Sequence, residues 1–175
     1  MKAISWGSLL ALLVYISLLT ACGAEAPKTA EQSLREAMEL YAGANGAAPD
    51  YAGALERFTQ AAEAGSVRAM CYIGYQYYSG QGTERSCEKA LEWWTKAAEA
   101  GDAEAMRCLG ILYRSGDGVE QSSGEAFAWF SKAAEAGDPN AMSCLAEMYE
   151  AGQSVAQDAD KAAQWRERAR QGGGQ

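Results

Sequence analysis

The chain repeats itself with a fixed period. The pentapeptide Ala-Ala-Glu-Ala-Gly occurs at 61–65, 97–101 and 133–137, so successive copies are 36 residues apart. A constant period of this length is typical of a stack of identical supersecondary units. Counting from the terminal glycines predicts four units without insertions, at 30–65, 66–101, 102–137 and 138–173. The repeat therefore predicts a solenoid before any helix propensity is considered.

Each unit is predicted to be a pair of helices. The apolar residues of 69–77 are spaced as one stripe of a helix, and a second stripe covers 90–98. The Gly-rich segment 79–82 separates them, and Gly101 follows the second as a left-handed C′ residue. Two such helices enclose too little core to be stable alone, so each hairpin must pack on its neighbours. The prediction is an all-α, right-handed solenoid of four helical hairpins.

One position of the repeat carries small residues. Gly74 and Gly110 share it, with Met38 in the first unit and Ala146 in the last. Glycine inside a helix is about 1 kcal/mol less favourable than alanine. Its recurrence indicates that another helix approaches closely there.

Another position carries tryptophan. Trp93, Trp129 and Trp165 share one phase of the repeat. An aromatic residue that recurs with the period is more often inter-repeat core than a ligand platform. We therefore expect Trp129 to be buried between its own hairpin and a neighbour.

The third unit carries a family motif. Residues 110–119 read Gly-Ile-Leu-Tyr-Arg-Ser-Gly-Asp-Gly-Val, and Trp129 and the Lys-Ala-Ala-Glu-Ala-Gly of 132–137 follow. This pattern resembles the Sel-1-like repeat family, a branch of the tetratricopeptide superfamily, over 66–173 and more loosely over 30–65. The resemblance implies a scaffold or adaptor that binds proteins and has no catalytic activity or cofactor.

The resemblance also implies a binding face. In the related tetratricopeptide fold, the first helix of each hairpin exposes positions two, five, nine and twelve on the concave side, with the small residue as position eight. In the central units these positions hold Arg68, Cys71, Tyr75, Tyr78, Glu104, Arg107, Ile111 and Arg114. Tyrosine and arginine are enriched among binding hot spots. We predict a locally basic, aromatic strip made of Arg68, Tyr75, Tyr78, Arg107, Ile111 and Arg114. This strip would bind a protein or an extended peptide whose carboxylates pair with the arginines. The alternative is a solvated face that binds nothing.

The N-terminus has the features of an export signal. Lys2 precedes an apolar stretch at 9–19, which is too short to span a membrane, and Leu-Thr-Ala-Cys follows at 19–22. The last four residues resemble a bacterial lipobox, which implies cleavage after residue 21 and acylation of Cys22. Gly23 in place of Asp implies the outer membrane. We expect a signal peptide at 1–21, a tether at 22–29 and a periplasm-facing lipoprotein; an ordinary secretory signal is the alternative.

The charge of the chain restricts its partners. The net charge is −8 and there is no histidine. The acidity argues against nucleic acid and against anionic lipid headgroups as ligands, so the membrane is contacted only through the N-terminal lipid. The absence of histidine removes the commonest general base and most catalytic zinc arrangements.

Cysteine spacing does not match a disulfide framework. Beside Cys22, the chain holds Cys71, Cys87, Cys108 and Cys144. The family's bridges would link positions that here hold alanine and methionine. Cys108 and Cys144 are equivalent in successive units, so their backbones should lie beyond the roughly 7 Å Cα limit for a bridge. Buried free thiols are favoured, with a Cys71–Cys108 bridge as the alternative.

Two other functions are considered. Ser86 and Lys89 match the Ser-x-x-Lys pattern of β-lactam-binding serine hydrolases, but Ser122 and Asp158 share the phase of Ser86 and are also good helix caps. A repeated cap is therefore the favoured interpretation. The recurring tryptophans could alternatively form a platform for peptidoglycan fragments or glycan in the periplasm.

Overall fold

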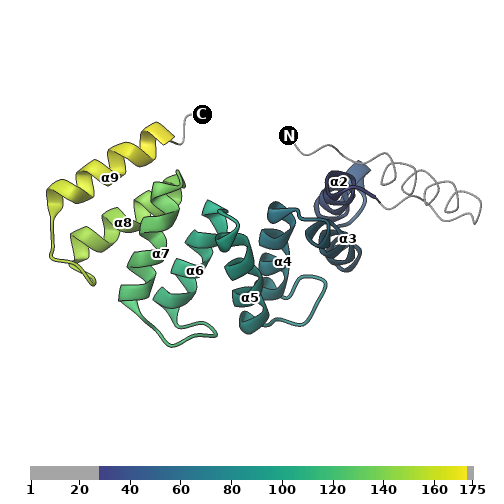
Figure 1. Ribbon diagram of the computed structural model, residues 1–175, viewed down its shortest axis with the longest axis horizontal. Coiled ribbons are helices and arrows are strands. Elements are labelled where there is room, and N and C mark those ends of the chain that lie inside the picture. Colours follow the sequence, from purple (N-terminus) through teal and green to yellow (C-terminus); the bar gives the residue numbers. More distant parts are fainter. Residues whose placement is uncertain (1–27, 173–175) are drawn as a thin grey trace, which may run out of the picture.

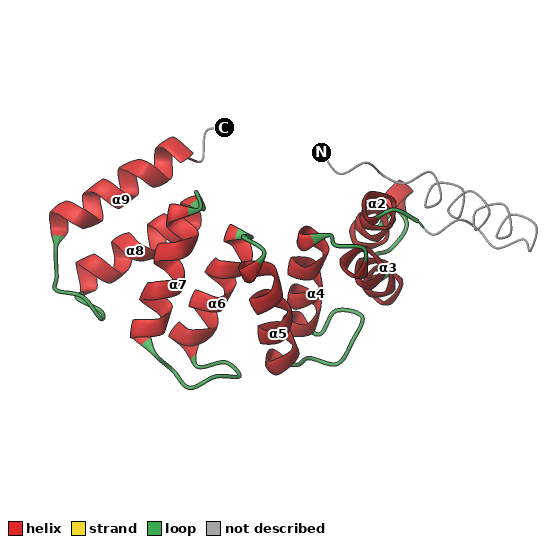
Figure 2. Cartoon of the chain, in the orientation of Figure 1, coloured by secondary structure: helices red, strands yellow, loops and turns green. Residues whose placement is uncertain are grey.

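The computed structural model describes residues 28–172. Within this range the chain forms eight α-helices, one short 3-10 helix and no strand. Figure 2 shows these helices joined by short loops, and Figure 1 shows four hairpins following one another along an arc. The helices are α2 (Ala30–Ala42), α3 (Tyr51–Glu63), α4 (Val67–Ser79), α5 (Cys87–Glu99), α6 (Ala103–Ser115), α7 (Ser123–Glu135), α8 (Pro139–Ala151) and α9 (Ala159–Gly172), with η1 (Ala44–Gly46) after α2. The all-α solenoid prediction is confirmed.

Repeated caps define where the helices begin and end. Ser66 Oγ accepts a hydrogen bond from the amide of Ala69, and the first helices of the other hairpins begin in the same way. The helices also end as predicted, because Gly80 has φ 73° after α4 and Gly101 has φ 94° after α5. Glycine adopts this left-handed conformation without steric cost.

The core is shared between hairpins. One cluster joins Trp94 of α5 to Leu109 of α6, another joins Phe58 of α3 to Ile73 of α4, and a third lies between α7 and α8. A methyl group added at Gly74 would lie 2.4 Å from Trp94 Nε1. The glycine thus makes room for the facing aromatic ring, as the small-residue position predicted. Each hairpin depends on its neighbours for burial.

The first unit is one residue longer than predicted. α4, α6 and α8 begin 36 residues apart, whereas α2 begins 37 residues before α4. The extra residue lies in the loop that contains η1, between α2 and α3. Ala37, and not Met38, therefore occupies the small-residue position, and its side chain is fully buried. Tyr41 likewise corresponds to Tyr78.

The recurring tryptophans do not occupy the buried aromatic position of the repeat. The prediction that Trp129 is buried between hairpins is therefore corrected. The fully enclosed rings are Phe58, Trp94 and Phe130, one residue later in the repeat. One residue is a rotation of about 100° on a helix, so Trp129 faces partly away from the core and is only half-buried. It still packs against the core that α5 forms with α4 and α6.

Candidate partner-binding face

The predicted strip lies on two neighbouring first helices. Arg68, Tyr75 and Tyr78 are on α4, and Arg107, Ile111 and Arg114 are on α6. Four of the six surround one small hollow between the helices, namely Tyr75, Tyr78, Arg107 and Ile111. Arg68 and Arg114 do not line it. The structure thus brings together the apolar part of the predicted strip.

The hollow is apolar and small. Its volume is about 70 Å³, and Trp94, Cys108 and Leu112 complete its lining. The Tyr75 and Trp94 rings meet edge to face, with centroids 5.3 Å apart and planes inclined at 78°. Tyr78 lies against the same indole at 5.6 Å. A side chain that entered the hollow would meet aromatic rings and Ile111.

The Tyr75 hydroxyl is already fully engaged. It donates to Glu104 Oε1 at 3.0 Å and accepts from Arg107 Nη2 at 3.2 Å and from Cys108 Sγ at 3.1 Å. Tyr78 donates its hydroxyl hydrogen to Asp117 at 3.0 Å. Because these polar atoms have partners within the chain, the hollow offers a ligand mainly apolar contact.

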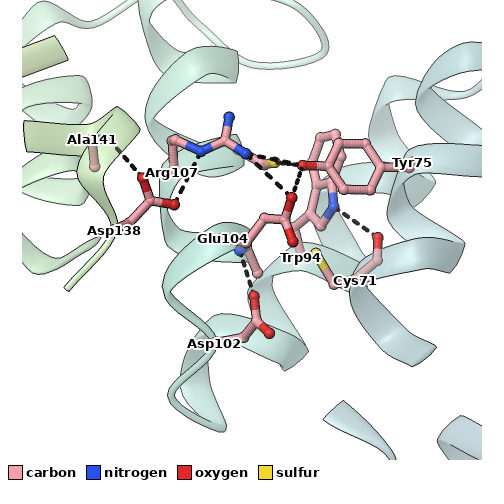
Figure 3. A network of polar contacts seen from close by, with 10 residues as sticks. Cys71, Tyr75, Trp94, Asp102, Glu104, Arg107, Asp138 and Ala141 are labelled. Atoms are coloured by element: carbon pink, nitrogen blue, oxygen red, sulfur yellow. Dashed lines mark hydrogen bonds and ion pairs between the residues drawn. The ribbon is translucent and has the colours of Figure 1, made fainter. Parts of the chain in front are cut away.

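Arg107 connects three hairpins. Beside Tyr75 of the second unit, its guanidinium contacts Asp138 of the fourth, with Nε 3.2 Å from Oδ2 (Figure 3). The other carboxylate oxygen of Asp138 caps α8 by accepting from the amide of Ala141 at 2.7 Å. Only 17% of the Arg107 side chain and 8% of the Asp138 side chain are exposed. This is a largely buried ion pair that links units.

Two of the three arginines of the strip are therefore already paired with carboxylates of the chain, whereas the prediction assumed that they were free to bind a partner. Arg107 is paired with Asp138 and Glu104, and Arg114 Nη1 lies 3.5 Å from Glu147 of α8. The sequence could not show the Arg107–Asp138 and Arg114–Glu147 pairs, because their members are on different units, whereas Glu104 and Arg107 lie three residues apart on α6.

The remaining predicted positions divide between surface and core. Arg68 is exposed, with its guanidinium 5.9 Å from the Tyr72 ring centroid. Cys71, which we expected on the exposed face, is 2% exposed and belongs to the core. Trp94, Cys108 and Leu112 were missed as lining residues. Trp94 could have been found, because it lies in the apolar stripe of 90–98.

The cysteines near the face are inert thiols. The structure has Cys71, Cys87, Cys108 and Cys144 as free cysteines. Burial raises the pKa of the Cys108 thiol to about 11 and raises the pKa of the Cys71 thiol further. Because the thiolate is the reactive form, neither group is activated as a nucleophile at neutral pH.

The Ser86 motif forms a helix cap in the structure. Ser86 Oγ accepts from the amide of Lys89 at 3.2 Å, and Ser122 does the same one unit later. The Lys89 ammonium lies 5.1 Å from the centre of the Tyr77 ring. This arrangement favours the cap over an activated serine.

The recurring tryptophans carry cations on their rings. Lys96 Nζ lies 4.4 Å from the Trp93 ring centroid, and Lys132 Nζ lies 4.1 Å from that of Trp129. Arg168 covers Trp165 in the same way. Because the rings are half-buried and covered, they do not offer the open stacking faces that a glycan platform needs.

Comparison with known proteins identifies the repeat. The family model described as Sel1 repeat matches 35–66, 67–102, 103–138 and 139–174. Comparison with curated proteins gave no match. No helix within the described residues is long and apolar enough to cross a bilayer.

Solved structures share the fold. A Sel1 repeat protein from Oxalobacter formigenes is 29% identical, with a TM-score of 0.77 over 83% of this chain and 59% of that one. The protective antigen c5321 of uropathogenic Escherichia coli strains, which displays an SLR fold, is 30% identical, with a TM-score of 0.74 over 81% of this chain and 30% of that one. This chain thus spans less than two thirds of either relative. MamA, at 16% identity and a TM-score of 0.52, shares the fold alone.

Proposed function

Because the chain belongs to the Sel1 repeat family, whose members generally mediate protein–protein interaction, we propose that it is a non-catalytic adaptor held by lipid in a bacterial cell envelope. The observation that carries the binding role is the hollow between α4 and α6, where aromatic and aliphatic side chains are left without a covering element. Ser86 Oγ caps α5 and burial raises the pKa of the Cys108 thiol to about 11, so neither side chain is an activated nucleophile, which supports a non-catalytic role.

The proposed face is tested by Ile111→Glu. Ile111 is half-buried and lines the hollow, and the equivalent residue of the fourth unit is Glu147, so the helix accepts glutamate at this position. A carboxylate at the mouth of an apolar hollow must be desolvated when the hollow is filled, which opposes binding. We expect immobilised Ile111→Glu protein to lose at least about 90% of the partner captured by the unmodified protein from envelope extracts, a change of about 1.4 kcal/mol or more.

A matched control separates the face from the added charge. Ala128 is exposed on α7, and the equivalent residues of other units are Glu56 and Glu92. Ala128→Glu adds the same charge away from the hollow and should capture the partner normally. Both variants must keep the helical circular dichroism of the unmodified protein. Equal capture by a folded Ile111→Glu protein would place the binding surface elsewhere.

The lipid anchor is tested by Cys22→Ser. Cys22 lies outside the described residues, and its role rests on the Leu-Thr-Ala-Cys motif that ends there. A multiply acylated cysteine anchors a protein stably, whereas one chain binds only marginally. In the native host we expect the variant to leave the membrane fraction or to keep its signal, seen as an increased mass. Outer-membrane fractionation with the mature mass unchanged would refute the lipoprotein proposal.

A further inference from the structure

We propose that the hollow between α4 and α6 takes one aliphatic side chain from a basic segment of the partner, such as a leucine flanked by lysines. This inference rests on the proposed binding function and specifies the partner's chemistry. It reverses the sequence-based expectation of an acidic partner.

The size of the hollow fits an aliphatic group. A cavity of about 150 Å³ holds a benzene molecule. The hollow, at about 70 Å³, has room for roughly half of that, which suits the branched end of Leu or Val. A Phe or Trp ring is too large. Strongly polar groups are disfavoured, because the hydroxyls of Tyr75 and Tyr78 already bond to Glu104 and Asp117.

The accessible charge beside the hollow is negative. Glu104 and Glu147 leave 54% and 66% of their side chains exposed, whereas Arg107 and Arg114 leave 17% and 40%. Arg107 is thus more covered than Glu104, and Arg114 is more covered than Glu147, whereas Asp138, the other carboxylate that Arg107 contacts, is itself only 8% exposed (Figure 3 shows Arg107 between Asp138 and Tyr75).

A count of charges agrees with the exposure. The ionised groups that contact residues lining the hollow are Arg85, Glu104, Asp117 and Asp138, beside Arg107 itself. Arg85 lies over the Tyr78 ring and donates to the carbonyl oxygen of Tyr78 at 3.0 Å, so it is also engaged within the chain. These two cations are outnumbered by three carboxylates, on a chain whose net charge is −8. A partner segment with lysines beside its apolar residue would therefore be attracted, and one with glutamates would be repelled.

Three synthetic peptides test the inference directly. The first has one leucine between two pairs of lysines, the second replaces the lysines with glutamates, and the third replaces the leucine with glycine. We expect calorimetric titration of the full-length protein at low salt to show at least about tenfold tighter binding of the first peptide than of either other. Raising the salt to about 0.5 M should weaken it, because exposed charges are screened.

Surface variants test whether the peptide binds at the hollow and at the exposed carboxylates beside it. Glu104→Gln and Glu147→Gln alter exposed side chains, and together they should weaken the lysine–leucine peptide at least about threefold at low salt. Ile111→Gln, which removes the apolar contact without adding a carboxylate, should weaken binding of this peptide at least about tenfold, and Ala128→Gln should not change it.

Each failure has its own meaning. Equal binding of the glycine peptide would show that the hollow is not used, and tighter binding of the glutamate peptide would overturn the charge argument. No binding of the lysine–leucine peptide would refute the inference as well. The proposed function would survive these results if partner capture still depended on Ile111, because that assay makes no assumption about the partner's charge.

Discussion

Phe130→Ala should destabilise the protein by about 3–5 kcal/mol, the usual loss for a fully buried aromatic ring. Phe130 is fully buried in the core between α7 and α8. Its neighbour Trp129 on the same helix is half-buried, so Trp129→Ala should cause a clearly smaller loss, about 1–2 kcal/mol. Urea unfolding followed by circular dichroism measures both. Equal losses, or a larger loss at Trp129, would contradict the assignment of the core position.

A second substitution makes this test specific for packing. A methyl group added at Gly110 would lie 2.6 Å from the Phe130 ring, so Gly110→Ala should destabilise the unmodified protein. When Phe130 is already Ala, the ring is gone and the better helix propensity of alanine remains, worth about 1 kcal/mol. Gly110→Ala should then become stabilising. A change of the same sign in both backgrounds would mean that Gly110 does not make room for the ring.

The hairpins could be predicted from the sequence because their causes are local. The caps at Ser66, Ser86 and Ser122 act within one helical turn, and the glycines after α4 and α5 act on their own backbone. The 36-residue period then copies the same local solution along the chain. No knowledge of distant contacts was needed.

The errors arose where local identity was ambiguous. Met38 lies 36 residues before Gly74, but the added loop residue places Ala37 at that position and places Tyr41 with Tyr78. The hydrogen bonds agree, since Tyr41 donates to Gln81 as Tyr78 donates to Asp117 one unit later. Because Tyr77 and Tyr78 are adjacent, Tyr41 matches a tyrosine with or without the added loop residue, so the sequence does not reveal the insertion. The aromatic position was misassigned for the same reason, because Trp93 and Trp94 are neighbours.

The ion pairs of the candidate face could not be predicted. Arg107 and Asp138 are separated by 31 residues, and Arg114 and Glu147 by 33. Whether such residues meet depends on how one hairpin is oriented on the next, which the repeat period does not specify. The sequence therefore placed the residues of the strip on the first helices of two neighbouring hairpins, but it could not show the carboxylates that pair with Arg107 and Arg114.

These ion pairs predict very different effects for two similar substitutions. Arg107→Glu should destabilise the protein by about 3 kcal/mol or more, because it leaves Asp138 buried beside a like charge. Arg114→Glu should lose no more than about 1 kcal/mol, because Arg114 and Glu147 are both exposed by more than a third of their side chains. Urea unfolding of both variants measures the difference. Similar losses would show that the Arg107–Asp138 pair does not join the third and fourth units.

A double-mutant cycle isolates the buried pair. Asp138→Asn keeps an oxygen that can cap α8 while removing the charge, and Arg107→Met keeps much of the aliphatic stem. For residues in direct contact we expect a coupling free energy of about 1–3 kcal/mol. The same cycle with Arg114→Met and Glu147→Gln should give a value near zero. A large coupling at the first pair alone would make Arg107 a residue that holds the units together, so the loss of partner capture in an Arg107 variant would report unfolding of the face and not a lost contact.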